Sequence, residues 1–396
     1  MLKRINQCDV YVGLWCIYML QEVLYSPGII NQLLQLIMLV WSMTAVFRCM
    51  IQSEIYKSTI LKATFFLIVM YTIYGTIHII FDAPIKVIGK YVYLQNALNS
   101  LAPIFLFYEF TMSGKLTSDR IRIYLPILLV TCILVYYRCE NEILLKTGKD
   151  EITNNIGYMF VTLIPILFFN SKRPILQFTF MGIILLYIFM GMKRGAILIG
   201  VIGLIVLLFA NMRNSSRSTK FIFIMLTIII VGGIIKYIDY MMNNSAYFMV
   251  RFEQTLEGNT SNRDIIYGSL WDALLSESHP LYFYFGRGAN STFRIVGSYA
   301  HQDWLETFCN NGLIGVFILF FFFYTLGKNA WESRMCFSGM MFYSFVTLFI
   351  IIFCKTLFSM SIQDIKMYES MLIGYFAYWV MQHTDNFEFY NYEQDE

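Results

Sequence analysis

Three separated segments of the chain combine glycine with cationic, imidazole and carboxylate side chains. They are Gly-Met-Lys-Arg-Gly at 191–195, a polar stretch at 258–264, and a longer stretch at 286–306. Arginine can engage a phosphate through two parallel hydrogen bonds and remains charged at any pH. Histidine titrates near neutrality and can accept a hydroxyl proton. The combination predicts a site that holds a pyrophosphate and activates a hydroxyl group.

The first two segments supply the arginines. A basic pair such as Lys193 and Arg194 often lies at a membrane interface and reaches towards lipid headgroups. Here the flanking glycines allow another group to approach closely, so we favour anion binding, with Arg194 ahead of Lys193. In the second segment, residues 261–262 could N-cap a helix that places Arg263 at its positive end. The alternative for Arg263 is a surface contact with a neighbouring aspartate or tyrosine.

The third segment supplies the histidine. A lone Gly-x-Gly turn around Arg287 is weak evidence of binding, whereas His301 is followed by Gln302, Asp303 and Glu306 within two helical turns. Carboxylates can orient an imidazole and stabilise its charged form, as in other catalytic sites. The alternative is a histidine that only caps a helix. We predict that His301 is catalytic and that the other four residues contribute to substrate binding.

The composition shows which kind of protein must position these residues. The chain has 396 residues, of which 58% are hydrophobic and only 14% are charged. Its mean hydropathy is +0.58. A soluble domain carries roughly a quarter charged residues, so these values indicate a multi-pass membrane protein. The net charge of +3 is too small and too dispersed to suggest nucleic acid binding. The eight cysteines form no CxxC or Cys/His pattern, so we expect neither a zinc site nor a disulfide framework. We also expect no bound metal and no cofactor.

Apolar runs recur along the whole chain. A transmembrane helix needs about 20 mostly apolar residues, and helix is the state that satisfies the backbone in lipid. We therefore predict an all-α protein with about twelve spans, near 8–25, 27–47, 60–80, 91–111, 121–138, 155–169, 175–191, 195–210, 221–238, 312–327, 337–354 and 370–382.

The distribution of Lys and Arg among the short connections predicts the orientation. It modestly favours cytoplasmic termini and places residues 239–311 on the extracytoplasmic side. This one long connection is rich in aromatic residues, so we expect a packed cap rather than disorder. Helices are predicted near 262–276 and 300–310, the second ending at Asn311–Gly312. The resulting domains are residues 1–238 (helices), 239–311 (cap), 312–382 (helices) and 383–396 (an acidic cytoplasmic tail).

These features resemble the O-antigen polymerase and O-antigen ligase superfamily over most of the chain. The resemblance rests on KRGAILIG at 193–200, SNRDIIYGSLW at 261–271, and GRGANSTF with AHQDWLETFCNNGLIG at 286–315. It implies a helical bundle related to the GT-C fold, with a large loop between the ninth and tenth spans. It also implies a glycosyltransferase that takes saccharide from an undecaprenyl-pyrophosphate carrier, without metal or nucleotide sugar.

The resemblance also implies roles for individual residues. Arg194 and Arg263 look like the pyrophosphate-binding arginines, and His301 looks like the histidine that activates the acceptor hydroxyl. Two positions depart from the family pattern. Lys193 stands where serine is common, which is compatible with anion binding. Gln302 follows the histidine where asparagine is common, which keeps an amide at this position on a side chain longer by one methylene group.

The identity of the acceptor stays open at this point. A polymerase transfers glycan to the next lipid-linked repeat unit, whereas a ligase transfers polymer to lipid A core or to a protein. We favour the polymerase, acting at the extracytoplasmic face of the cytoplasmic membrane, with a chain-length regulator and a flippase as further partners. A lipid-linked oligosaccharide transporter is a weaker alternative, because such proteins commonly show an internal repeat and the sequence shows none. A structural scaffold would not need the arginines and the histidine.

Overall fold

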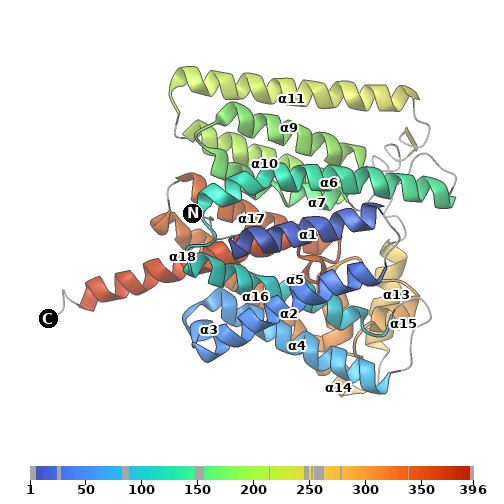
Figure 1. Ribbon diagram of the computed structural model, residues 1–396. Coiled ribbons are helices and arrows are strands. Elements are labelled where there is room, and N and C mark those ends of the chain that lie inside the picture. Colours follow the sequence, from blue (N-terminus) through green and yellow to red (C-terminus); the bar gives the residue numbers. More distant parts are fainter. Residues whose placement is uncertain are drawn as a thin grey trace. The chain divides into compact units, whose positions relative to one another are not determined.

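The computed structural model describes residues 6–24, 28–82, 89–147, 156–213, 215–244, 249–250, 253, 263–276, 279–337 and 339–392. These residues form helices joined by turns, and no strand occurs among them (Figure 1). The prediction of an all-α protein is therefore confirmed. The chain divides into two compact units, each built from three separate segments. Unit 1 comprises residues 1–36, 114–259 and 333–351, and unit 2 comprises residues 37–113, 260–332 and 352–396.

The helices of each unit follow the predicted segments closely. Those of unit 1 are α1 (Gln7–Leu24), α6 (Ser118–Thr147), α7 (Gly157–Val161), α8 (Ile164–Leu167), η1 (Phe168–Asn170), α9 (Pro174–Met190), α10 (Arg194–Arg213) and α11 (Arg217–Asn244). Those of unit 2 are α3 (Glu54–Lys57), α4 (Thr59–Phe81), α5 (Val92–Met112), α13 (Arg263–Leu275), α14 (Pro280–Phe285), α15 (Ser291–Val296), η2 (Ile362–Asp364) and α18 (Met367–Tyr392). Three helices belong in part to each unit, namely α2 (Ile29–Ile51), α16 (Asp303–Cys336) and α17 (Gly339–Phe358).

Several helices have the dimensions of membrane spans. Within the described residues, seven are long and apolar enough to cross a membrane: 29–51, 59–81, 118–141, 194–213, 219–244, 303–336 and 339–358. Two shorter apolar stretches, 157–170 and 174–190, accompany them. Only 6% of the apolar window of α11 is buried, which is the exposure expected of a helix that faces lipid. The chain is thus a multi-pass helical membrane protein.

The segment predicted as a single sixth span is a broken helix. Residues 157–170 form α7, α8 and η1 in succession, and all of them are buried. Pro165 in the first turn of α8 has no backbone N–H to donate to the preceding turn, which explains the break. Neighbouring side chains donate hydrogen bonds to carbonyls of the broken segment. Gln177 Nε2 donates to the Leu167 carbonyl at 3.0 Å, and Ser344 Oγ donates to the Pro165 carbonyl at 2.7 Å. Such a break is tolerated in a membrane protein where protein groups replace the lost hydrogen bonds.

The predicted boundary at Asn311–Gly312 appears as a sharp kink within α16. Gly312 has φ 65° and ψ −162°, a conformation that residues with a side chain avoid. The arm before the kink folds back on the arm after it. This is shown by the ring centroids of Trp304, before the kink, and Phe323, after it, which lie 5.7 Å apart. In a continuous helix these two residues would be separated by more than about 25 Å, at about 1.5 Å per residue.

A second glycine makes the kink possible. Gly286, with φ 72°, packs directly on the backbone of α16, so an added Cβ atom would overlap the main chain of Asn310. An added Cβ atom at Gly312 would in turn overlap the backbone of Gly286 and Tyr284. The turn after α14 and the kink of α16 can therefore cross only if both positions lack a side chain. We call this contact the glycine crossing.

The glycine crossing predicts a steep penalty for Gly312→Ala. The new methyl group would both strain the left-handed backbone and collide with Gly286, so we expect a large loss of folded protein and a lower Tm. Gly232→Ala is the matched control, because a Cβ atom at Gly232 meets nothing within 4 Å and alanine favours a helix interior. Size-exclusion profiles and thermal melting of both variants in detergent measure the difference. Equal behaviour of the two variants would contradict the importance of the crossing.

Candidate active site

The segment 287–292 is bound to the arm of α16 that precedes the kink. The backbone N–H groups of Arg287 and Gly288 donate to the carbonyls of Cys309 and Asn310, at 2.9 and 3.0 Å. Both the backbone N–H and the hydroxyl of Ser291 donate to Asn310 Oδ1, at 2.9 and 2.8 Å. The motif Gly-Arg-Gly therefore acts as a backbone clasp on α16, which its sequence pattern alone did not indicate.

Glu306 connects this clasp to the loop that carries His301. The carboxylate of Glu306 is buried and accepts hydrogen bonds from Thr292 Oγ1 at 2.7 Å and from Asn310 Nδ2 at 3.0 Å. Its other oxygen accepts the backbone N–H of Ala300 at 2.9 Å. Because Ala300 immediately precedes His301, Glu306 determines where the histidine loop begins.

His301 itself lies at the turn before α16. Its φ is 54°, in the left-handed region that is uncommon for residues other than glycine, and its side chain is exposed. Such backbone strain is concentrated at functional sites, where the surrounding structure enforces it. Gln302, the next residue, is half-buried. The turn thus presents an imidazole to the outside of the unit from a closely held backbone.

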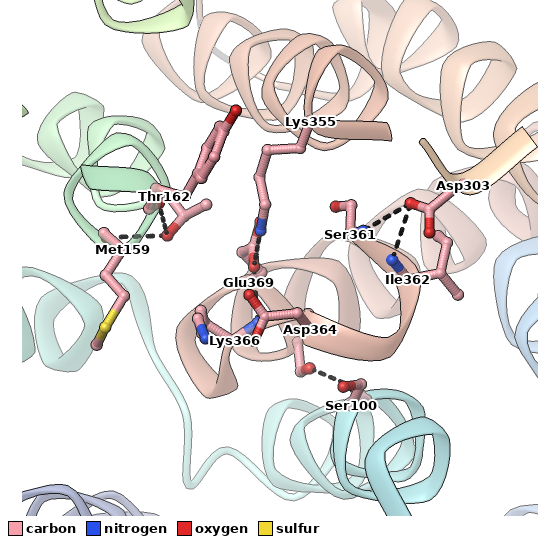
Figure 2. Close-up of polar contacts among 12 residues, drawn as sticks. Ser100, Met159, Thr162, Asp303, Lys355, Ser361, Ile362, Asp364, Lys366 and Glu369 are labelled. Atoms are coloured by element: carbon pink, nitrogen blue, oxygen red, sulfur yellow. Dashed lines mark hydrogen bonds and ion pairs between the residues drawn. The ribbon is translucent and has the colours of Figure 1, made fainter. Parts of the chain in front are cut away.

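Asp303 fixes the far side of the same turn. Its buried carboxylate accepts the backbone N–H groups of Ser361 and Ile362, at 2.6 and 3.2 Å (Figure 2). These residues lie in the connection that leads through η2 to α18. The indole N–H of the adjacent Trp304 donates to Thr356 Oγ1 at 3.0 Å, near the end of α17. The start of α16 is therefore anchored to the polypeptide around residues 356–362.

Two candidate arginines lie at opposite ends of α13, a helix that confirms the predicted segment 262–276. Arg263 begins the helix and donates from Nη2 to the carbonyl of Phe358 at 3.1 Å. Arg287 donates from Nη2 to the carbonyl of Ala273, in the last turn, at 2.5 Å. Leu270, between them, is buried in a cluster with Ala300, Leu305 and Cys309. The predicted N-caps at 261–262 lie outside the described residues.

Lys193 and Arg194 belong to unit 1, and Lys193 lies in the turn between α9 and α10. Met192 in this turn has φ 49°, and Arg194 is the first residue of α10. Gly157, at the start of α7, packs against the turn, since an added Cβ atom there would lie 3.4 Å from Ala196 Cβ. Both cationic side chains are half-buried. They are held by a close helix contact rather than by a mobile loop.

A polar cluster around His78 was missed at the sequence level. His78 is buried near the end of α4, with Nδ1 2.8 Å from Asp82 Oδ2 and 2.9 Å from Arg294 Nη2 of α15. Arg294 also pairs with Asp82. Burial raises the pKa of Asp82, but hydrogen bonds from His78 and Arg294 outweigh this effect, so its pKa lies below the ordinary value. The available signal was His78 followed four residues later by Asp82, which places both on one helix face.

A buried ion pair was missed as well. Lys355 Nζ lies 3.2 Å from both carboxylate oxygens of Glu369, and the two side chains are 1% and 0% exposed (Figure 2). Glu369 also accepts the backbone N–H of Lys366 at 2.7 Å. A buried charge is costly unless it is paired, so the two residues depend on each other. A lysine inside the apolar run of α17 was the signal for this pair.

Unit 2 therefore gathers six of the eight predicted site residues around α13 and the start of α16. They are Arg263, Arg287, His301, Gln302, Asp303 and Glu306. Lys193 and Arg194 lie in unit 1. Among the described residues, no group of three or more His, Cys, Asp or Glu side chains could hold a metal ion. The predicted site residues of unit 2 offer cationic, imidazole and carboxylate groups together with the amide of Gln302.

Comparison with known proteins adds no further assignment. No protein-family model matches the chain, and no curated protein matches it.

The buried ion pair predicts a specific loss of stability. Glu369→Gln leaves the ammonium of Lys355 buried without a counter-charge, which should cost about 3–5 kcal/mol of unfolding free energy. The matched control is Glu332→Gln, whose exposed partner Lys328 lies 3.8 Å away, and which should change stability by less than about 1 kcal/mol. Denaturant unfolding in mixed micelles measures both. A loss at residue 369 no greater than that at residue 332 would refute the account, and Lys355→Met should rescue Glu369→Gln.

Proposed function

We propose that the chain is a repeat-unit polymerase, a membrane glycosyltransferase that moves saccharide from an undecaprenyl-pyrophosphate carrier to a lipid-linked acceptor. The observation that carries this proposal is the exposed His301 on a strained turn, held from behind by the buried carboxylates of Asp303 and Glu306. The arginines of the resembling motifs add groups suited to a pyrophosphate. The proposal also draws on the resemblance of the three motif segments to the O-antigen polymerase and ligase superfamily.

The proposed reaction is a displacement at the anomeric carbon of the donor sugar. His301 accepts the proton of an acceptor hydroxyl as the hydroxyl oxygen bonds to that carbon. The bond between the carbon and the pyrophosphate oxygen breaks, and undecaprenyl pyrophosphate departs with the bonding electrons. Arg194 and Arg263 are the arginines that the resemblance assigns to the pyrophosphate, and a guanidinium there stabilises the negative charge that develops on the leaving group. The chain's own side chains supply both the base and the charge stabilisation.

Asp303 and Glu306 receive a positioning role in this proposal. Each of these carboxylates accepts hydrogen bonds from backbone or side-chain groups of neighbouring segments. We infer that they act on the histidine through the backbone of its turn and not as its orienting partner. A turn held at both ends keeps a reacting group within the narrow geometry that catalysis needs. Gln302 and Arg287 complete the proposed binding residues.

The proposed location is the cytoplasmic membrane, with about twelve spans and both termini in the cytoplasm. Seven helices among the described residues have the length and hydropathy of a span, which supports the coarser part of this proposal. Residues 239–311 would then lie on the extracytoplasmic side, where lipid-linked repeat units are presented by a flippase. A chain-length regulator is a further proposed partner. The tail predicted at 383–396 continues α18 as far as Tyr392, and residues 393–396 lie outside the described residues.

The donor site predicts loss of polymer from single arginine variants. Arg194→Ala and Arg263→Ala should abolish surface polymer in a complemented deletion strain, while lysine replacements should restore only part because a point charge lacks the bidentate geometry. Arg122→Ala is the control, since Arg122 makes an exposed pair with Asp119. Gel analysis of the polysaccharide and immunoblots of the protein give the result. Wild-type polymer from either site variant removes that arginine from the proposal, and unattached polymer in the deletion strain indicates a ligase.

The proposed role of His301 as the base predicts that its removal slows saccharide transfer but changes donor binding little. His301→Ala should bind lipid-linked donor nearly normally and transfer saccharide about 10²–10⁴-fold more slowly, the usual contribution of general base catalysis. His279→Ala, at an exposed histidine of the same unit, should transfer at the wild-type rate. Single-turnover assays with purified protein separate the two effects. If Glu306→Gln or Asp303→Asn loses more rate than His301→Ala, that carboxylate is the base instead.

A further inference from the structure

Unit 1 contains a group of tyrosines that the proposed chemistry does not use. Tyr187 of α9 stacks on Phe160 of α7, with ring centroids 4.9 Å apart and an angle of 8° between the rings. Tyr136 and Tyr137 of α6 pack edge-on against Tyr187, with centroids at 5.3 and 6.1 Å. The hydroxyls of Tyr137 and Tyr187 lie 3.3 Å apart. These rings form one packed assembly built from three helices.

A carboxylate accompanies the rings. Glu140, one turn after Tyr136 on α6, interacts with the Tyr136 hydroxyl and is half-buried. Its charge also acts on Tyr187 and on Tyr237 of α11. We call Tyr136, Tyr137, Tyr187, Tyr237 and Glu140 the tyrosine cluster. It combines aromatic faces, phenol hydroxyls and one carboxylate, and Tyr137 at its edge is 46% exposed.

The tyrosine cluster lies directly beside the turn that carries Lys193 and Arg194. The backbone N–H of Gly191, at the start of that turn, donates to the carbonyl of Tyr187 at 3.1 Å. Gly157 lies on the other side of the turn, one helical turn before Phe160. An added Cβ atom at Gly157 would lie 3.7 Å from Lys193 Cβ. The rings of Tyr187 on α9 and Phe160 on α7 therefore lie within one or two helical turns of Lys193 and Arg194.

This arrangement differs from an ordinary interfacial aromatic belt. In a belt, single tyrosines point outward and place their hydroxyls among headgroups. Here the rings pack against one another, the hydroxyls of Tyr137 and Tyr187 meet, and Glu140 interacts with the hydroxyl of Tyr136. Binding sites for small molecules typically combine apolar and aromatic walls with a few converging polar groups. An aromatic face that packs on ring C–H groups, with a carboxylate and phenols for hydroxyl groups, is suited to a saccharide.

We propose that the tyrosine cluster binds the saccharide of the lipid-linked donor, next to the phosphates that Arg194 engages. The donor is favoured over the acceptor because its first sugar is bonded directly to the pyrophosphate and so must lie beside the arginine that holds it. This inference rests on the proposed function and adds a determinant of which glycan is accepted. It assigns a role to α6, α7 and α9, which carry no residue of the proposed reaction.

The test compares two carriers that differ only in the glycan. Purified protein in nanodiscs is titrated with bare undecaprenyl pyrophosphate and with undecaprenyl pyrophosphate that bears the oligosaccharide unit of the source cells. Wild-type protein should bind the glycosylated carrier at least about tenfold more tightly, a preference that a few well-placed contacts supply. Tyr137→Leu and Glu140→Gln should remove this preference and leave the affinity for the bare carrier within about twofold. Tyr137→Phe keeps the ring and should retain most of the preference for the glycosylated carrier.

The control is Tyr324→Leu, which removes an exposed tyrosine of α16 and should leave both affinities unchanged. If wild-type protein binds both carriers equally, or if Tyr137→Leu and Glu140→Gln keep the full preference, the saccharide site is overturned while the pyrophosphate assignment stands. If wild-type protein binds neither carrier, the proposed function fails and this inference fails with it. A preference lost in both cluster variants and kept in Tyr324→Leu supports the assignment.

Discussion

The close approach of two backbones at Gly286 and Gly312 is the constraint on which the candidate site depends. Only residues without a Cβ atom allow this crossing, and both have positive φ values. The crossing holds residues 287–292 against the first arm of α16, where four hydrogen bonds to Cys309 and Asn310 follow. From there Glu306 reaches the backbone of Ala300. The position of His301 is thus a consequence of where two glycines meet.

The buried carboxylates support the candidate site, whereas the exposed histidine is the group proposed to react. Asp303 and Glu306 lie inside the unit and are satisfied by hydrogen-bond donors, whereas His301 on the same turn is exposed. Lys355 and Glu369 add an internal ion pair close to the connection that Asp303 holds. Because an unpaired charge in this interior would be costly, each of these residues restricts its hydrogen-bonding partners to one arrangement. A rigid support behind a reactive group is the arrangement that a catalytic turn requires.

Features set by local sequence could be predicted, and features set by distant partners could not. The helical segments and the break at Gly312 follow from apolar run length and from glycine, which act within a few residues. The interruption at Pro165 was also local, but the apolar composition of its surroundings concealed it. The four-residue spacing of His78 and Asp82 can be read from the sequence. The contacts of Arg294 with both of them and the Lys355–Glu369 pair join residues from separate helices, so no spacing along the chain reveals those. For the same reason the sequence suggested that Asp303 or Glu306 orients the imidazole. The hydrogen bonds of Asp303 go to Ser361 and Ile362, and those of Glu306 go to Thr292, Ala300 and Asn310.

The central claim is that this chain alone transfers saccharide between two lipid-linked carriers. The most direct measurement is to reconstitute the purified protein in liposomes with undecaprenyl-pyrophosphate-linked repeat units, with a chelator present and without nucleotide sugars. The account predicts carriers that bear two or more repeat units, together with an equal amount of released undecaprenyl pyrophosphate. Repeat units that stay single while the protein is folded and binds the carrier would contradict it.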